Sequence, residues 1–147
     1  MSQSKILMVC VGNVCRSPVA ERALSEHLGT AECVVSAGLG ALVGNMADQI
    51  MYDVAEVRGL SLEGHEAQQI DRELVRTSKL ILVMEAGHRR VLMEKFPEVS
   101  GRVMLLDHWT GGRDIEDPYR RGRAISERVY EQIMEGAAAW ASVLKAV

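Results

Sequence analysis

The sequence predicts an α/β protein with a single three-layer αβα domain, in which helices cover both faces of a parallel sheet. Short apolar runs rich in branched residues alternate along the chain with segments whose apolar residues recur at helical spacing. That alternation is typical of parallel strands joined by right-handed helical crossovers. The length of 147 residues and the hydrophobic content of 48% suit one core, so we expect residues 1–147 to form one domain.

The first strand and the first helix are predicted on either side of a short loop. Lys5–Val11 is a continuous apolar run, which fits a strand buried on both faces, and a Gly-Asn pair ends it. Ser17 is the expected N-cap of the helix that follows, because Pro18 would then occupy the first helical position. Gly29 is the expected end of this helix.

A second strand is predicted at Glu32–Ser36, followed by a glycine-rich apolar loop at Ala37–Gly44. Asn45 is the expected cap of the next helix, whose apolar residues recur at helical spacing as far as Gly59. Ser61–Gln69 has only weak periodicity, so we expect a loop there.

The second half of the chain continues the alternation. Asp71–Thr77 is a predicted short helix and Lys79–Met84 a third buried strand. A helix is predicted at Gly87–Phe96, where a following proline ends it, and Arg102–Leu106 is the fourth strand. His108–Tyr119 contains two adjacent glycines and a proline, so we expect a surface loop before a long amphipathic helix that closes the chain.

The composition excludes several classes of protein. A net charge of −3 argues against a nucleic-acid-binding protein, which would carry a basic surplus. No apolar run is long enough to span a bilayer, so we expect no membrane insertion, and no signal peptide is visible. Three cysteines without a framework spacing then favour the reducing cytoplasm.

The segment from Cys10 to Arg16 is the most informative motif in the chain. It joins the first strand to the first helix, so it lies at the carboxyl end of the sheet, where parallel α/β proteins bind ligands. Inward-pointing N–H groups of such a loop, together with a helix N-terminus, bind a tetrahedral anion such as phosphate. A guanidinium can hold two oxygens of the same phosphate.

Cys10 has the surroundings of a nucleophile. A helix N-terminus and a nearby arginine both favour the thiolate, which is the reactive form of cysteine. The loop N–H groups and Arg16 would supply the electrostatic stabilisation, so we expect no metal and no other cofactor. The alternative interpretation is a buried core cysteine beside a solvated arginine.

A thiolate that attacks a phosphate monoester needs an acid to protonate the leaving oxygen. Asp117 is the best candidate in the predicted loop at His108–Tyr119, which we call the late loop, because Pro118 restricts its backbone to extended conformations. Tyr119 is placed to stack on an aromatic substrate. The alternative is that Asp117 only initiates a turn.

Two motifs in this sequence resemble the low-molecular-weight protein tyrosine phosphatases. They are Cys-Val-Gly-Asn-Val-Cys-Arg-Ser-Pro near the N-terminus and Asp-Pro-Tyr near the C-terminus, and Met84-Glu85 is a further short motif of this kind. The resemblance covers essentially the whole chain, and it implies a four-stranded sheet in the order 2-1-3-4, a phosphatase-I-like fold. The segments SAGLGALVG and SLEGH are most similar to bacterial members encoded with capsule or exopolysaccharide export systems.

The resemblance implies a role for each site residue. Cys10 would be the nucleophile that forms a phosphocysteine, Arg16 would bind the phosphate, and Asp117 would act first as acid and then as base. The residues implied to bind phosphate or substrate are Val11, Gly12, Asn13, Val14, Cys15, Ser17 and Tyr119. Those implied to hold the loop in shape are Asn13, Ser36 and His65. The implied partner is a tyrosine autokinase of polysaccharide export.

Cys15 lies five residues after Cys10, and a reactive thiol near a second cysteine is the usual arrangement of a redox-sensitive site. Many members of the family have such a pair, which implies a reversible Cys10–Cys15 disulfide. An inert apolar residue under the loop is the alternative for Cys15. Cys33 is expected to face the core.

Three other functions are weaker interpretations. A zinc site would need a second pair of ligands, which the sequence does not supply at a suitable spacing. Arsenate reduction on the same fold would need further cysteines downstream, and none follows Cys33. A phosphotyrosine-binding module would need neither a nucleophile nor an acid.

Overall fold

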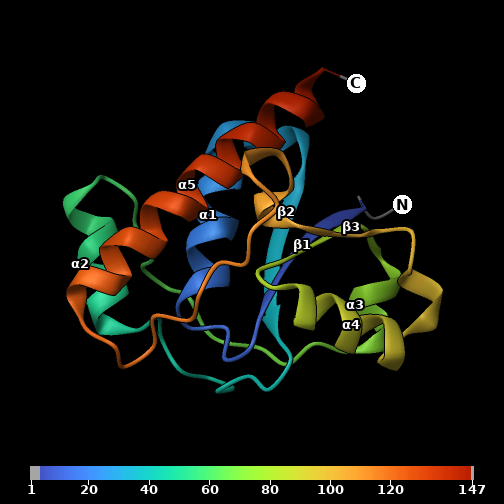
Figure 1. Cartoon of the computed structure of the whole chain (residues 1–147), viewed down its shortest axis with the longest axis horizontal. Coiled ribbons are helices and arrows are strands. Elements are labelled where there is room, and N and C mark those ends of the chain that lie inside the picture. The colour runs from blue at the N-terminus through green and yellow to red at the C-terminus, as the bar shows by residue number, and fades with distance from the viewer. Residues whose placement is uncertain (1–3, 147) are drawn as a thin grey trace.

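The computed structural model describes residues 4–146 and contains one four-stranded parallel sheet in the order β2-β1-β3-β4, as expected (Figure 1). The strands are β1 (Lys5–Cys10), β2 (Cys33–Gly38), β3 (Ser78–Val83) and β4 (Val103–Leu105). The α-helices are α1 (Arg16–Leu28), α2 (Gln49–Val57), α3 (Arg72–Arg76), α4 (Ala86–Lys95) and α5 (Arg123–Lys145). Three short 3₁₀ helices are η1 (Gly29–Ala31), η2 (Pro97–Val99) and η3 (Leu106–Thr110).

Helices cover both faces of the sheet, with α1, α2 and α5 on one face and α3 and α4 on the other (Figure 1). Side chains of β1 alternate between the two faces, as the pleat of a strand requires. Met8 and Cys10 belong to the apolar cluster under α1 and α5, whereas Leu7 and Val9 belong to the cluster on the opposite face. The buried central strand therefore carries its last residue, Cys10, to the carboxyl edge of the sheet.

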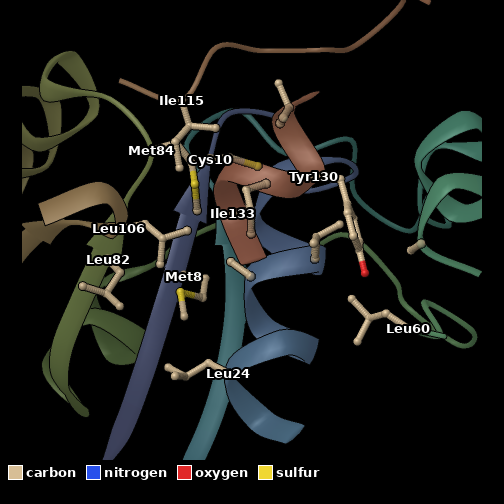
Figure 2. Close-up of a cluster of buried hydrophobic side chains, with 14 of the residues drawn as sticks. Met8, Cys10, Leu24, Leu60, Leu82, Met84, Leu106, Ile115, Tyr130 and Ile133 are labelled. Atoms are coloured by element: carbon tan, nitrogen blue, oxygen red, sulfur yellow. The ribbon is translucent and has the colours of Figure 1, made fainter. Parts of the chain in front are cut away.

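The larger apolar cluster extends from the middle of the sheet to this edge. Leu24 lies at its lower end in Figure 2, and Met84, Cys10 and Ile115 lie at the upper end. The loop that follows β1, residues 11–15, is therefore supported by packed side chains.

α5 packs along α1 and α2 and closes the sheet on that side. Its buried residues recur at helical spacing: Val129, Ile133, Ala137 and Trp140 are among them. Every helix within residues 4–146 is too short or too polar to cross a membrane.

The predicted helix caps are wrong at two positions. α1 begins at Arg16 with Cys15 as its N-cap, so Ser17 lies inside the first turn, where its hydroxyl contacts Cys10 instead of capping the helix. The N-cap of α2 is Asp48, whose carboxylate accepts a hydrogen bond from the Met51 amide at 3.1 Å. Asn45, the expected cap of α2, lies in the preceding loop.

Two predicted loops are more ordered than expected. β2 continues through Ala37 to Gly38, and Gly38 also pairs with Gln69. The late loop begins in η3 and is not confined to the surface, because the side chain of Ile115 is completely buried. Cys33 is only partly buried at the start of β2 and belongs to neither large core cluster, so the expectation that it faces the core is wrong.

Gly38 makes a close backbone approach to the loop after β1. A Cβ atom at this position would lie 2.3 Å from the carbonyl oxygen of Val11 and 3.1 Å from the Cα atom of Ala41. We expect Gly38→Ala to lower the free energy of unfolding by about 1–3 kcal/mol, because backbone must move to admit the methyl group. Urea denaturation measures this loss.

Gly40→Ala is the matched control, because nothing lies within 4 Å of the added Cβ atom. Its free energy of unfolding should change by less than about 0.5 kcal/mol. Equal losses in the two variants would show that the close approach at Gly38 is not the cause.

Candidate active site

A pocket lies at the carboxyl end of β1 and collects residues from distant parts of the chain. The loop after β1 forms its floor, and the loop after β2 and the late loop form its walls. The lining residues are Cys10, Val11, Gly12, Val14, Cys15, Arg16, Gly40, Leu42, Asp117 and Tyr119. The three residues expected to carry the chemistry, Cys10, Arg16 and Asp117, therefore meet at one pocket.

Asn13 holds the loop in its conformation from inside. Its φ angle is 60°, in the left-handed region that asparagine tolerates better than most residues. Its side-chain nitrogen donates hydrogen bonds to the hydroxyls of Ser17 at 2.7 Å and Ser36 at 3.0 Å. Its side-chain oxygen accepts a hydrogen bond from the Gln68 amide at 2.9 Å. The buried amide of Asn13 thus ties the loop to β2 and to the segment before α3.

His65 and Ser36 support the same loop. His65 is buried, and its Nε2 lies 2.6 Å from the carbonyl oxygen of Asn13. Because a carbonyl oxygen only accepts, Nε2 carries the hydrogen. Ser36 in turn donates to the Glu21 carboxylate at 2.7 Å. His65 is therefore not a surface residue, and both side chains contact the loop as the resemblance implies.

The thiol of Cys10 contacts the side chain of Ser17. Its Sγ lies 2.9 Å from the hydroxyl oxygen of Ser17. Since that hydroxyl already accepts a hydrogen bond from Asn13, its own hydrogen is free to donate to the sulfur. A donated hydrogen bond stabilises a thiolate more than a thiol. The cysteine belongs to the core cluster and also lines the pocket, so burial and access to a ligand occur together.

The guanidinium of Arg16 is buried and firmly oriented. Nη1 donates to the Glu85 carboxylate at 2.5 Å and to the carbonyl oxygen of Ile115 at 2.7 Å. Nη2 lies 3.8 Å from Oδ2 of Asp117. The arginine is 1% exposed, so the solvated-arginine alternative is wrong. Nη1 is thus held by Glu85 and Ile115, and Nη2 faces Asp117.

Asp117 takes part in two arrangements that the sequence presents as alternatives. Its Oδ1 accepts a hydrogen bond from the Tyr119 amide at 3.1 Å, which is a turn formed by an aspartate side chain. Its Oδ2 faces Arg16. The turn therefore does not compete with a position in the pocket but helps to set it.

Tyr119 forms part of the wall beside Asp117. Its ring packs against a small cluster of Val14, Cys15 and Ala67. The guanidinium of Arg120 lies 5.1 Å from the ring centroid. These contacts hold an aromatic face at the side of the pocket.

The late loop is anchored by a buried carboxylate, that of Asp107. It accepts hydrogen bonds from the Thr110 hydroxyl and the Arg113 amide, each at 2.8 Å, and from Gln132 at 3.3 Å. Burial alone would raise the pKa of Asp107, but these hydrogen bonds outweigh it and hold the pKa below its ordinary value. The loop that presents Asp117 is thus fixed several residues upstream.

Two residues that contact Arg16 received no role in the sequence interpretation. Glu85 lies two residues after the end of β3, so the rule that places ligands at the carboxyl ends of parallel strands would have found it. Ile115 acts through its backbone: its amide donates to the carbonyl oxygen of Met84 at 2.8 Å, and its carbonyl oxygen accepts from Arg16. No side-chain pattern could reveal that contact.

Cys15 lies beneath the loop and is 3% exposed. Burial raises the pKa of its thiol strongly, and the negative charge of Asp48 adds to this effect. The thiol therefore stays protonated at neutral pH. Within residues 4–146, no group of three or more His, Cys, Asp or Glu side chains is arranged to hold a metal ion.

Comparisons with known proteins point to one family. The family model of low molecular weight phosphotyrosine protein phosphatases matches residues 5–147. The low molecular weight protein-tyrosine-phosphatase Wzb of Salmonella typhimurium is 50% identical over 143 residues, which cover 97% of this chain and 95% of that protein.

Solved structures agree with the sequence comparison. The tyrosine phosphatase Wzb from Escherichia coli K30, in complex with sulphate, superposes with a TM-score of 0.93 and 38% identity over 97% of this chain and 99% of that one. Wzb of Vibrio vulnificus, in complex with benzylphosphonate, has a TM-score of 0.91 and 41% identity over 96% of this chain and 99% of that one.

Proposed function

Because the chain belongs to the low molecular weight phosphotyrosine protein phosphatase family, we propose that it hydrolyses phosphotyrosine through a phosphocysteine formed on Cys10. One observation carries the proposal: the Cys10 thiol, the Arg16 guanidinium and the Asp117 carboxyl line the same pocket. A binding module would need only the loop and the arginine, whereas hydrolysis needs all three groups.

In the first step the Cys10 thiolate attacks phosphorus. A sulfur–phosphorus bond forms, and the bond from phosphorus to the tyrosine oxygen breaks. Asp117 gives its proton to that oxygen, so tyrosine leaves as a neutral phenol. Arg16 and the N–H groups of the loop stabilise the charge on the phosphoryl oxygens.

In the second step Asp117 takes a proton from water, and the resulting hydroxide attacks the phosphocysteine. The sulfur–phosphorus bond breaks, inorganic phosphate forms, and the thiolate is restored. The hydrogen bond from Ser17 stabilises the departing thiolate. The reaction is balanced by water alone and consumes no cofactor.

The walls of the pocket suit an aromatic substrate. Leu42 and Val11 offer apolar surface, and Tyr119 adds an aromatic ring. Flat apolar walls above a phosphate site favour an aryl phosphate over a phosphoserine, whose side chain is short and polar. Benzylphosphonate, present in the Vibrio vulnificus relative, has the same combination of ring and tetrahedral anion.

The finer biological role is also a proposal. The segments SAGLGALVG and SLEGH and the similarity to Wzb proteins support a partner among the tyrosine autokinases that control capsule or exopolysaccharide export. We place the reaction in the cytoplasm and assign it to one domain over residues 1–147. Phosphatase assays on such a kinase, phosphorylated on its tyrosines, test this assignment.

Hydrolysis of an aryl phosphate and of a phosphotyrosine peptide, with a metal chelator present, tests the reaction itself. We expect the wild-type protein to turn over both substrates and Cys10→Ser to lose about 10³-fold or more of kcat, because the alkoxide is not available at neutral pH. Calorimetry should show that Cys10→Ser still binds inorganic phosphate. A reduced wild-type protein that binds phosphopeptide without hydrolysing it would favour the binding-module interpretation.

Asp117→Asn tests the acid. The loss of kcat should be about 10²-fold or more with phosphotyrosine, whose leaving group needs a proton, and much smaller with 4-nitrophenyl phosphate, whose leaving group does not. The measurement is kcat for both substrates with both proteins. Equal losses would remove Asp117 as the acid.

We also propose that Cys15 forms a reversible disulfide with Cys10, and oxidation by hydrogen peroxide tests this role. The Cys10 thiolate first displaces hydroxide from peroxide and becomes a sulfenic acid, and the sulfur of Cys15 then displaces water to form a disulfide. Because the raised pKa keeps Cys15 protonated, we expect the disulfide to form faster as the pH rises from 7 to 9.

Peptide mapping identifies the disulfide, and Cys15→Ser is the control. In that variant a second equivalent of peroxide should oxidise the Cys10 sulfenic acid to the sulfinic acid, so activity should be lost without recovery by a thiol reductant. Failure to find a Cys10–Cys15 peptide at any pH would support the inert apolar role for Cys15.

A further inference from the structure

A buried histidine lies behind the arginine of the pocket. His88 is in the first turn of α4, which begins directly after Glu85, and it is 7% exposed. Its Nε2 lies 3.4 Å from Oε2 of Glu85, and the same oxygen accepts the 2.5 Å hydrogen bond from Arg16. The three side chains therefore form a chain that runs from α4 through the carboxylate to the guanidinium.

We propose that His88 is a positioning residue of the phosphatase reaction, whose Nε2–H holds the Glu85 carboxylate where that carboxylate orients Arg16. The inference rests on the proposed function, since it takes Arg16 as the group that binds the phosphate. His88 itself does not touch the substrate, because Glu85 and Arg16 stand between it and the pocket.

Glu85 needs such a restraint because it has other choices. It is the N-cap residue of α4, a place where a side chain often turns back to the helix amides. Its side chain is 32% exposed and makes no cap hydrogen bond. The Ala86 amide is instead capped by Asp114 at 2.9 Å. The carboxylate of Glu85 instead lies against Arg16 and His88.

The surroundings of His88 favour a neutral imidazole. Burial lowers its pKa, and the positive charge of Arg16 lowers it further, against the opposing effect of the carboxylates of Glu85, Asp114 and Asp117. A neutral imidazole carries one hydrogen, and next to a carboxylate that hydrogen belongs on Nε2. A neutral donor orients Glu85 without competing with Arg16 for its charge.

Packing alone does not account for a histidine at this position. Nδ1 is buried and has no hydrogen-bond partner among the described residues. A buried polar atom without a partner is destabilising, and an apolar side chain would avoid that cost. The unpaired nitrogen is therefore consistent with a histidine retained for the contact that its other nitrogen makes.

The test compares His88→Leu, which cannot donate, with His88→Gln, whose amide can. We expect His88→Leu to lower kcat/KM for an aryl phosphate about tenfold and to raise the dissociation constant of inorganic phosphate by a similar factor. His88→Gln should recover most of both quantities. The melting temperature of His88→Leu should not fall, because the substitution removes an unpaired buried polar atom.

A double-substitution cycle separates positioning from general damage. Lysine has no fork for Glu85 to orient, so in an Arg16→Lys background His88→Leu should have little further effect on phosphate binding. His27→Leu, at an exposed site on α1, is the control for the substitution itself and should leave all quantities unchanged. If His88→Leu does not fold, His88→Met provides the same test with a more adaptable side chain.

The inference is overturned if His88→Leu binds phosphate and turns over substrate like the wild type. It is also overturned if leucine and glutamine cause equal losses together with a lower melting temperature, since that would indicate a structural role. Because phosphate affinity is measured without turnover, the test of His88 does not depend on the proposed reaction. A wild-type protein that binds phosphate but hydrolyses nothing would contradict the proposed function, and the phosphate constants would still decide the role of His88.

Discussion

The buried guanidinium of Arg16 is the constraint on which the rest of the site depends. A permanent positive charge that is almost fully removed from water must be paired and hydrogen-bonded, or the fold loses several kcal/mol. Its partners come from three places: Glu85 after β3, the backbone of Ile115 in the late loop, and Asp117 two residues further on. The charge therefore draws the ends of distant elements to one point.

The loop after β1 depends on the buried side chain of Asn13. This residue takes a left-handed conformation, and its side chain makes hydrogen bonds with the hydroxyls of Ser17 and Ser36 and with the Gln68 amide. Buried hydrogen bonds stabilise a loop only when each donor has an acceptor, and both donors of the Asn13 side chain have one. Side-chain hydrogen bonds of Asn13 therefore hold the shape of this loop.

The sequence predicts the fold well because the signals for it are local. Apolar runs mark the strands, and the end of the first run places Cys10 at the ligand-binding edge. The errors occur where the three-dimensional shape of a loop, rather than residue type, decides which groups a side chain meets. Ser17 and Asn45 have the composition of helix caps, but the Ser17 hydroxyl is engaged by Cys10 and Asn13, and the loop geometry gives the cap of α2 to Asp48. Strand order follows only from the family resemblance, whereas Asp117 is indicated by the proline after it, and the contact of Ile115 through its backbone has no sequence signal.

The carboxyl group of Asp117 has two oxygens in different surroundings, and this difference decides the path of the proton. Oδ1 is occupied by the Tyr119 amide, a donor that disfavours a proton on the same atom. Oδ2 lies 3.8 Å from Nη2 of Arg16, which lines the same pocket. In the proposed reaction the proton leaves from Oδ2 with the tyrosine and returns to Oδ2 from water. The same oxygen atom thus loses the proton and takes one up again. Each catalytic cycle therefore ends with Asp117 protonated as it began, without rotation of the side chain.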